Sequence, residues 1–537
     1  MPANPKIPSA LAPVVVGFAS LNDFRPKPLL MKPRPHLTIT CTGCPDGFDG
    51  QVIYLETPPD FSTIYNVSPL YQGAQPITGK GQTVVVLEES DIRGADVQTF
   101  RKAFGLSSFS GKFSQIHPGP GCTDPGMNGA IFEASLDAEW AGAVAPDANV
   151  KLASCSDTNT LPGILLAAVN LIESASPPPI MSLSFGTCEA NIGPGGNAFF
   201  KSLWQMADGE GVSVFVSSGD GAAAGCDDFN TSSFAVVGIG ASGYASTPYN
   251  VAVGGTDFLA PILPNNGVSA YWSASNSPTG QSAMSYIPEM PWNDSCASNV
   301  LYKLFGFSSG VAFCNSATAA QDGLLNIVGG SGAPSIIYAK PPWQQGIVGM
   351  PNDGKRDLPD VSLFSSNGFY GQAIVFCMSV VSQGGTPCNY SVPLDVFSNS
   401  AGGTSFAAPQ FASIQALINQ KAGAPQGNPN PVLYQLHKTA FGTAANPKIS
   451  GLASCNASLG NRVSPACIFH DVTSGNNDVP CFGSNNCFPQ SATLLGVLST
   501  SDTTLQVAYP STRGWDFTSG LGSVNVTNLV NMWPSTQ

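Results

Sequence analysis

Ser405 is the serine best placed for chemistry in this sequence, within the run Gly-Gly-Thr-Ser-Phe-Ala-Ala-Pro at 402–409. It stands between a glycine-rich turn and an apolar stretch that predicts a helix over Phe406–Gln420. We expect an exposed hydroxyl with small neighbours that admit a substrate, near a helix N-terminus whose dipole favours negative charge. This combination is typical of a nucleophile.

A serine nucleophile needs a base, and histidine does not suit that role here. A subtilisin-type site pairs its serine with a histidine. The chain has only four histidines, and none stands in a context such as His-Gly-Thr-His: His36, His117, His437 and His470. A different group must therefore deprotonate Ser405.

Glu133 and Asp137 are the best candidates for the base. They belong to the helix-forming stretch Phe132–Ala141, where a spacing of four places both carboxyl groups on one face. Two partly buried carboxyls this close cannot both ionise easily, so one pKa rises and the pair titrates as a unit. Glu133 can then be the general base while Asp137 orients it. Acidic pairs at this spacing are also common on solvated faces, but the flanking residues here are apolar.

Asp220 is the third candidate, and it follows the apolar run 212–216 and a Ser-Ser-Gly turn. The run predicts a buried parallel strand, and α/β sheets place their sites at the carboxyl ends of such strands. If its carboxyl is protonated, Asp220 can donate a hydrogen bond to an oxyanion. An aspartate in a glycine turn is also a frequent structural feature.

Together these segments resemble the sedolisin family of serine-carboxyl peptidases. The resemblance implies a subtilisin-like fold with a Ser-Glu-Asp triad, in which Ser405 is the nucleophile, Glu133 the base and Asp137 its partner. Ser405 and Pro409 match the Gly-Thr-Ser-x-x-x-Pro signature of the family, and Asp220 matches its oxyanion aspartate. The three motifs in this order are a specific signal.

The resemblance covers nearly the whole chain after its first few dozen residues, including segments 57–65, 249–257 and 514–522. In two places the chain departs from the family pattern: Gly402 precedes Gly403 where serine is usual, and Gly-Ala-Ala follows Asp220 in place of Ser-Gly-Ala. Neither change touches a catalytic position. The family also implies that Glu88 extends the carboxyl network, although the adjacent Glu89 leaves that assignment open.

A second constellation near the C-terminus predicts a calcium site. Ca²⁺ takes several hard oxygen ligands from carboxylates and backbone carbonyls in flexible loops. The resemblance implies one structural Ca²⁺, bound by the carboxylates of Asp471 and Asp516 and the carbonyls of Val472, Thr512 and Gly514. Thr512 stands where glycine is usual, which a carbonyl ligand tolerates. Read from spacing alone, the two aspartates are turn formers.

The elements that must position these residues alternate along the chain. Short apolar runs predict central parallel strands at Thr83–Leu87, Val150–Ala153, Ile180–Leu183, Val212–Val216 and Asn250–Val253. Helices are predicted between them at Ala130–Ala143, Leu161–Ser174 and Ala198–Ala207. This order predicts an α/β fold with a doubly wound, mostly parallel sheet flanked by helices and long surface loops. Residues 261–345 are expected to be such loops.

The strand end Ser182–Gly186 has a possible function of its own. An extended peptide backbone could pair with it beside the nucleophile, as in strand addition elsewhere. An ordinary strand end is the alternative reading.

Composition restricts the partners and the compartment. The chain has 537 residues, 58 glycines, 45 prolines, 10% charged residues and a net charge of −13. Without a basic stretch to neutralise phosphates, nucleic acid is excluded as a partner. Few charged residues also mean few ion pairs to lose when carboxylates protonate, which fits operation in acid. No segment is long enough to span a membrane.

The fourteen cysteines indicate disulfides and an oxidising compartment, because no zinc-like pattern accompanies them. Close pairs are 41 with 44, 377 with 388, 455 with 467, and 481 with 487; longer candidates are 188 with 226 and 296 with 314. Six Asn-x-Ser/Thr sequons permit secretion. The stretch Ala10–Phe18 and the proline-rich Phe24–Pro35 are similar to the end of a sedolisin propeptide and its linker, so we predict a propeptide tail and linker over 1–56 and a peptidase domain over 57–537.

The sequence thus predicts a secreted, monomeric, acid-active endopeptidase that hydrolyses proteins and peptides. Two alternatives stay open: a tripeptidyl peptidase with the same triad and a blocked cleft, and a non-catalytic secreted binding protein on the same scaffold. The intact triad argues against the second.

Overall fold

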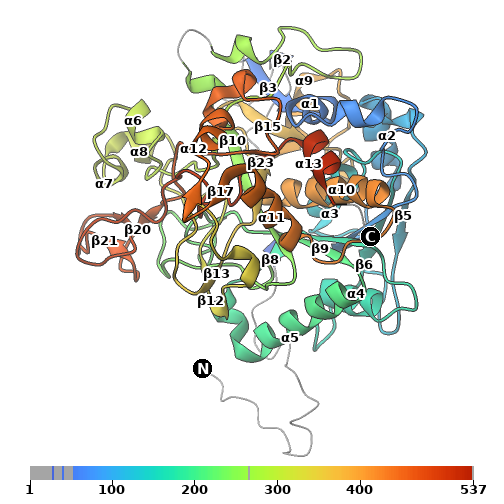
Figure 1. Ribbon diagram of the computed structural model, residues 1–537, viewed down its shortest axis with the longest axis horizontal. Coiled ribbons are helices and arrows are strands. Elements are labelled where there is room, and N and C mark those ends of the chain that lie inside the picture. Colours follow the sequence, from blue (N-terminus) through green and yellow to red (C-terminus); the bar gives the residue numbers. More distant parts are fainter. Residues whose placement is uncertain (1–26, 29–38, 41–51, 264–266, 535–537) are drawn as a thin grey trace, which may run out of the picture.

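A sheet of eight strands lies at the centre of the computed structural model, which describes residues 27–28, 39–40, 52–263 and 267–534 (Figure 1). Its order is β11-β10-β9-β7-β4-β6-β5, with β14 also beside β10. All neighbours run parallel except β10 and β11. In chain order, the strands are β4 (Thr83–Glu88), β5 (Phe113–Ile116), β6 (Asn149–Ser154), β7 (Ile180–Leu183), β9 (Ser213–Ser217), β10 (Val251–Phe258), β11 (Glu289–Pro291) and β14 (Val361–Phe364).

Both faces of this sheet are buried, which explains why its strands read as continuous apolar runs. Val84 and Val86 of β4 face the core that contains α3 (Ile131–Trp140) and α10 (Thr404–Ala422), whereas Val85 and Leu87 face the core of α4 (Gly163–Ile172) and α5 (Glu189–Gly209). Figure 1 shows the first pair of helices on one side of β9 and β6 and the second pair on the other. The predicted doubly wound, subtilisin-like α/β fold is confirmed. Each predicted strand and helix around the central sheet is present, but β10 continues five residues beyond the predicted end at Val253, and α5 begins nine residues before the predicted start at Ala198.

A smaller sheet joins the beginning of the described chain to the nucleophile turn. Its order is β16-β15-β3-β2, with strands β2 (Ile39–Thr40), β3 (Val52–Glu56), β15 (Gln372–Val375) and β16 (Ser400–Ala401). β3 pairs in parallel with β15 and leads directly into α1 (Pro58–Ile64). Thr57 and Asp60 cap the N-terminus of this helix with a capping box. The domain boundary at residue 56 stays a prediction, and Ala10–Phe18 and most of Phe24–Pro35 lie outside the described residues.

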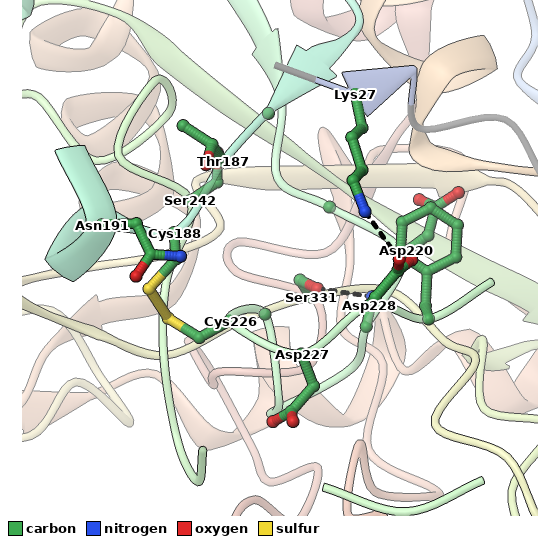
Figure 2. A pocket seen from close by; sticks show the side chains of 15 residues that line it. Lys27, Thr187, Cys188, Asn191, Asp220, Cys226, Asp227, Asp228, Ser242 and Ser331 are labelled. Atoms are coloured by element: carbon green, nitrogen blue, oxygen red, sulfur yellow. Dashed lines mark hydrogen bonds and ion pairs between the residues drawn. A yellow bond between two sulfur atoms is a disulfide. The ribbon is translucent and has the colours of Figure 1, made fainter. Parts of the chain in front are cut away.

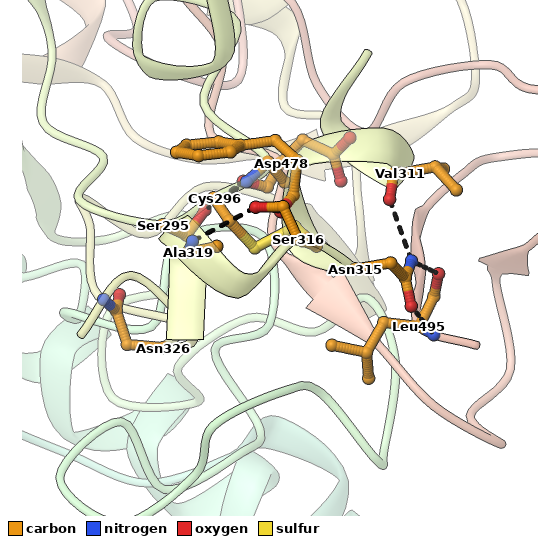
Figure 3. Close-up of a disulfide and its surroundings, with 12 residues drawn as sticks. Ser295, Cys296, Val311, Asn315, Ser316, Ala319, Asn326, Asp478 and Leu495 are labelled. Carbon is orange, nitrogen blue, oxygen red and sulfur yellow. Dashed lines mark hydrogen bonds between the residues drawn. A yellow bond between two sulfur atoms is a disulfide. The ribbon is translucent and has the colours of Figure 1, made fainter. Parts of the chain in front are cut away.

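The prediction that residues 261–345 form surface loops is wrong in part. The segment contains β11, the short helices α6 (Leu301–Leu304), α7 (Gly310–Cys314) and α8 (Ala317–Gln321), and β12 (Pro334–Ala339). A disulfide joins Cys296 to Cys314, and the Asn315 side chain donates to Val311 O at 2.8 Å and Leu495 O at 2.9 Å (Figure 3). Elements of three to six residues leave no measurable periodicity, so the pattern could not reveal them.

The remaining elements are short and lie mostly in the C-terminal half. The helices are α2 (Gly94–Ala103), α9 (Pro393–Ser398), α11 (Asn430–Phe441), α12 (Ile449–Ser454) and α13 (Val526–Met532). The strands form small sheets: β12 with β13 (Lys355–Asp357), β17 (Gly442–Thr443) with β18 (Asn446–Pro447), β19 (Phe469–His470) with β23 (Ser523–Val524), and β22 (Gly496–Leu498) between β20 (Pro480–Cys481) and β21 (Cys487–Phe488). None of the described helices has the length and apolar character needed to cross a membrane.

Disulfides hold many of these loops. Five pairs predicted from the sequence are confirmed: 188 with 226, 296 with 314, 377 with 388, 455 with 467, and 481 with 487. The structure adds a sixth, Cys122 with Cys155, which the sequence analysis did not pair. The predicted pair Cys41 and Cys44 lies outside the described residues.

Buried ionisable groups away from the nucleophile make stability depend on pH in two opposite ways. Burial, the charge of Asp60 and that of Glu289 raise the pKa of Glu56 well above its usual value, although a Gln410 hydrogen bond opposes this. Folding therefore retains a proton that the unfolded chain releases, and this contribution to stability is lost as pH rises above about 4.5. Burial lowers the pKa of His437 and His470 to about 3, so stability is also lost as pH falls below about 6.5.

We expect Glu56→Gln to flatten the loss of stability above pH 5, because glutamine is neutral and of similar shape. At pH 4 the variant and the wild type should unfold at nearly the same temperature. At pH 7 the variant should unfold at a higher temperature, because its free energy of unfolding is larger by on the order of 1 kcal/mol for each unit by which folding raises the pKa of Glu56. Calorimetry between pH 3 and 8 measures this. The exposed Glu210→Gln is the control, and identical curves for all three proteins would contradict the expectation.

Candidate active site

The nucleophile turn joins β16 to α10 through two glycines that the geometry requires. A Cβ on Gly402 would lie 2.3 Å from the carbonyl carbon of Ser366, and Gly403 has a φ of 140°, which L side chains rarely adopt. The helix begins at Thr404, so Ser405 lies in its first turn, whereas the predicted helix began one residue after it, at Phe406. Ser405 is fully buried in this arrangement, not exposed, because the turn packs it against α3 and against Ser184, which directly precedes β8 (Phe185–Gly186).

Glu133 lies on α3 and faces the nucleophile. Ser405 is close enough to lower the pKa of the Glu133 carboxyl, yet neither its Oγ nor the two carboxyl oxygens make a well-formed hydrogen bond with any described residue. Hydrogen bonds between a nucleophile and its base are often long until substrate binds. Burial, followed by the charge of Asp137, raises the pKa of Glu133 well above its usual value.

Asp137 lies one turn further along α3, where Ser184 links it to the turn that carries Ser405. The Ser184 hydroxyl donates to its carboxylate at 2.9 and 2.8 Å and also lies 3.2 Å from the Ser405 carbonyl oxygen. Burial raises the pKa of Asp137 to about 7, although the bonds from Ser184 and the nearby carboxyl of Glu88 lower it. The Glu88 oxygens make no well-formed hydrogen bond with a described residue, and burial, followed by the charge of Asp137, raises the pKa of Glu88 well above its usual value. The expected extension of the network to Glu88, rather than Glu89, agrees with this geometry.

Asp220 lies in the loop after β9 and contacts the residue before the nucleophile. Its Oδ1 accepts from Thr404 N at 2.9 Å and Thr404 Oγ1 at 2.7 Å. Its Oδ2 is buried and has no hydrogen-bond partner among the residues that the structure describes. Burial raises the pKa of Asp220 to about 7, although the Thr404 bonds oppose the rise. In mild acid the free oxygen therefore carries a proton and can serve as a donor.

Two contributors to this site were missed by the sequence analysis. Ser184 fixes Asp137, and Thr404 fixes Asp220. Both stand inside motifs that were singled out, Ser-Leu-Ser-Phe-Gly and Gly-Thr-Ser, so their positions were visible. Their hydroxyls gain a role only because β7, α3 and α10 meet at one edge of the sheet.

The histidines have other partners, as expected. His117 Nε2 lies 3.1 Å from Asp91 Oδ1, His437 packs against Phe441 and Phe469, and His470 Nδ1 lies 3.2 Å from Ser523 Oγ. His36 lies outside the described residues. The described part of the chain therefore offers carboxyl groups, and not an imidazole, to Ser405.

The predicted calcium ligands come together from two separated loops. Gly514 N donates to Asp471 Oδ1 at 2.9 Å, and Thr512 N donates to Asp516 Oδ2 at 2.8 Å. Asp471 Oδ2 is buried without a hydrogen-bond partner among the described residues. Burial, with the charge of Asp516, raises the pKa of Asp471 to about 8. Two buried carboxylates that repel each other, one with an unsatisfied oxygen, fit a hard cation that binds oxygen.

A comparison with known families places the chain. The profile of the Subtilase family matches residues 126–461, more than half of the chain and a stretch that includes Glu133, Asp137, Asp220 and Ser405. The chain therefore belongs to the subtilase family.

Its similarity to individual proteins points to one branch of that family. It is 27% identical over 485 residues to kumamolisin from Bacillus sp. (strain MN-32) and 23% identical over 475 residues to sedolisin from Pseudomonas sp. (strain 101). These matches cover 88% of this chain but 66% of kumamolisin and 60% of sedolisin, so the chain spans about two thirds of their length or less. It is also 23% identical over 445 residues to tripeptidyl-peptidase 1 of Mus musculus, over 81% of this chain and 64% of that protein.

A solved structure supports the same placement. Pseudomonas sedolisin, described as a serine-carboxyl proteinase complexed with two molecules of pseudo-iodotyrostatin, superposes with a TM-score of 0.57 at 21% identity. The superposition covers 90% of this chain and 98% of that one. The predicted resemblance to the sedolisin family and the subtilisin-like fold are confirmed.

We expect Gly402→Ala to destabilise the protein by about 1–3 kcal/mol, because the added Cβ overlaps the backbone of Ser366 and Asn367. Urea unfolding followed by circular dichroism measures the loss. Gly209→Ala at the end of α5 is the matched control, since a Cβ there meets nothing within 4 Å and should be neutral or slightly stabilising. Equal stability of the two variants would show that the turn has room for a side chain.

Proposed function

We propose that this protein is a secreted, acid-active serine-carboxyl endopeptidase that hydrolyses protein and peptide bonds. The contact between Ser405 and the buried carboxyl of Glu133, on a scaffold of the subtilase family, is the observation that carries the proposal. The charge of Asp137, one turn away, raises the pKa of Glu133, and Asp220 offers a protonated oxygen near the turn that carries Ser405. A non-catalytic binding protein would have no need to bury four carboxyl groups together.

The reaction follows from these positions. Glu133 takes the proton of Ser405 while Oγ attacks the peptide carbonyl carbon, and Asp137 stabilises the protonated base. Asp220 and the Ser405 backbone N–H donate to the oxyanion that develops. Glu133 then gives its proton to the leaving amine, the C–N bond breaks, and water hydrolyses the ester bond to Ser405 with Glu133 again as base.

The pairing at β8 supports the proposal of an endopeptidase over that of a tripeptidyl peptidase. β1 (Lys27–Pro28) pairs antiparallel with β8, with Lys27 opposite Gly186 and Pro28 opposite Phe185. Lys27 is preceded by 26 residues in the sequence, so this edge accepts a strand whose chain continues on its N-terminal side. A tripeptidyl peptidase must instead close the cleft on a free amino terminus.

Replacement of the base or the nucleophile should abolish hydrolysis. We expect Ser405→Ala and Glu133→Gln each to lower kcat/KM on a denatured protein substrate at pH 4 by on the order of 10³-fold or more. Product sequencing by mass spectrometry also separates internal cleavage from stepwise release of tripeptides. Glu210→Gln is the control, and full activity of Glu133→Gln would remove the proposed base.

The pH dependence tests Asp220 separately. Because its pKa is raised to about 7, the wild type should lose kcat/KM as pH rises through about 7 and the donor proton leaves. Asp220→Asn keeps an N–H donor at every pH, so we expect reduced activity that no longer depends on this proton. An unchanged alkaline limb in Asp220→Asn would assign that limb to another group.

We further propose one structural Ca²⁺, bound by the carboxylates of Asp471 and Asp516 with the carbonyls of Val472, Thr512 and Gly514. The unsatisfied Asp471 oxygen and the repulsion between the two carboxylates support this set. The ion would neutralise both and tie the loops at 471–477 and 512–516 together. It takes no part in the chemistry at Ser405.

Removal of calcium should therefore lower stability. We expect EGTA to lower the unfolding temperature by an amount equivalent to about 3 kcal/mol at a hundredfold excess of Ca²⁺ over its Kd, and Ca²⁺ but not Mg²⁺ to restore it. Asp471→Asn should be insensitive to EGTA, whereas the exposed Asp502→Asn keeps the full response. If EGTA lowered the unfolding temperature of both variants equally, Asp471 would not be a ligand of the ion.

Protein and peptide chains are the proposed partners, and the proposed state is a monomer. The six disulfides of the described residues support secretion, because oxidising compartments preserve such bonds. The propeptide tail and linker over 1–56 is proposed on the sequence resemblance alone.

A further inference from the structure

The edge of β8 sets the direction in which a bound peptide must run. Ser184 directly precedes β8 and contacts both Asp137 and the Ser405 carbonyl oxygen, so the Ser184 end of this strand is the end at the nucleophile. A strand antiparallel to β8 approaches that end as it runs from its N- to its C-terminus. In a bound peptide, the residue opposite Ser184 therefore lies nearer to the bond that Ser405 attacks. The residue opposite Gly186, where Lys27 now lies, comes two residues earlier in the peptide.

A cavity of about 380 Å³ lies beside this edge and has a negative lining. Lys27 is the only cation among its lining residues, and Asp220, Asp227 and Asp228 are its carboxyl groups. Figure 2 shows the Lys27 side chain extended along the cavity to Asp228, where Nζ lies 2.6 Å from Oδ2. The cavity thus contains a basic side chain from a strand in the position of a peptide.

Only one of the three carboxyl groups is available to bind that cation. Burial raises the pKa of Asp220, so it is protonated in acid. Asp227 accepts hydrogen bonds from the backbone N–H groups of Val236 at 2.8 Å and Val237 at 3.2 Å. Its carboxylate thus binds the backbone of its own loop. Asp228 directs Oδ2 at Lys27. Burial raises its pKa, but the contact with Lys27 and the bonds from Asn230 and Thr231 together outweigh burial, so the pKa is lowered.

The position of Asp228 is set before any peptide binds. The disulfide between Cys188 and Cys226 ties the chain after β8 to the residues just before Asp228 (Figure 2). Asn230 N donates to Asp228 Oδ1 at 3.2 Å and holds the carboxylate from the other side. A carboxylate that is fixed relative to β8 selects for a side chain at one position of the peptide and not for positive charge in general.

We infer that Asp228 forms a subsite for a lysine or arginine side chain at the substrate residue that pairs with Gly186, and that the chain's own Lys27 occupies this subsite when β1 covers β8. The inference rests on the proposed peptidase function. β1 and a substrate use the same edge, so they exclude each other, and Lys27 competes with a basic substrate side chain.

The expected preference is modest. In the pair with Lys27, the Lys27 and Asp228 side chains are 59% and 33% exposed, and ion pairs of this kind change an equilibrium by about two- to fivefold. The preference should shrink as salt is raised, since exposed charges are screened. It should persist in acid, because Asp228 ionises below its usual range.

Binding to the inert Ser405→Ala chain tests the subsite without relying on hydrolysis. Dansyl-labelled octapeptides of Ala, Gly and Ser carry one Lys or one Gln at each position in turn, and fluorescence gives Kd at pH 5. At one position the Lys peptide should bind about two- to fivefold more tightly than the Gln peptide. Adding Asp228→Asn should bring the ratio to one, whereas adding the exposed Asp502→Asn should leave it unchanged.

The competing segment gives a second readout. Lys27→Gln on the Ser405→Ala background should tighten binding of the Lys peptide by a similar factor, because β1 loses its ion pair, whereas the exposed Lys80→Gln should not. A Lys-to-Gln ratio of one at every position, or a ratio that survives Asp228→Asn, would overturn the subsite. If the active chain cleaves none of the peptides, the proposed function fails, yet the binding ratios still decide the role of Asp228.

Discussion

The burial of carboxyl groups without a neighbouring cation is the constraint on which this structure depends. Glu88, Glu133, Asp137 and Asp220 are all buried, and none forms a salt bridge with a lysine or arginine among the described residues. An ionised carboxylate in such surroundings is strongly disfavoured, so these groups share or keep protons. The burial that brings these carboxyl groups together therefore also raises their pKa values.

The core positions Glu133 against Ser405. α10 carries Ser405 and packs beside α3, which carries Glu133 and Asp137. Trp140 fixes this contact: its indole N–H donates to Val375 O at 2.8 Å, and its ring lies 6.3 Å from that of Phe406 in an edge-on arrangement. The geometry of the site therefore follows from large apolar side chains that take no part in chemistry, because close-packed interiors transmit small shifts.

The edge of β8 connects the site to the rest of the chain. It accepts an extended strand, and the chain supplies one in Lys27–Pro28. Of the segment Ser182–Gly186, Phe185 and Gly186 pair with this strand of the protein itself, and the pairing of a separate peptide stays a prediction. The disulfide at Cys188 holds the acidic loop beside this edge, so the cleft keeps its shape although long loops build it.

Sequence patterns by themselves determined the central strands, the two helices of the site and the residue types that meet there, because apolar period, turn glycines and carboxyl spacing are local properties. Tertiary structure alone decided that Ser405 is buried, that Ser184 holds Asp137, that Cys122 pairs with Cys155 and that Asp228 meets Lys27. These contacts join segments that lie tens to hundreds of residues apart. Their partners depend on strand order and helix packing, which no local pattern contains.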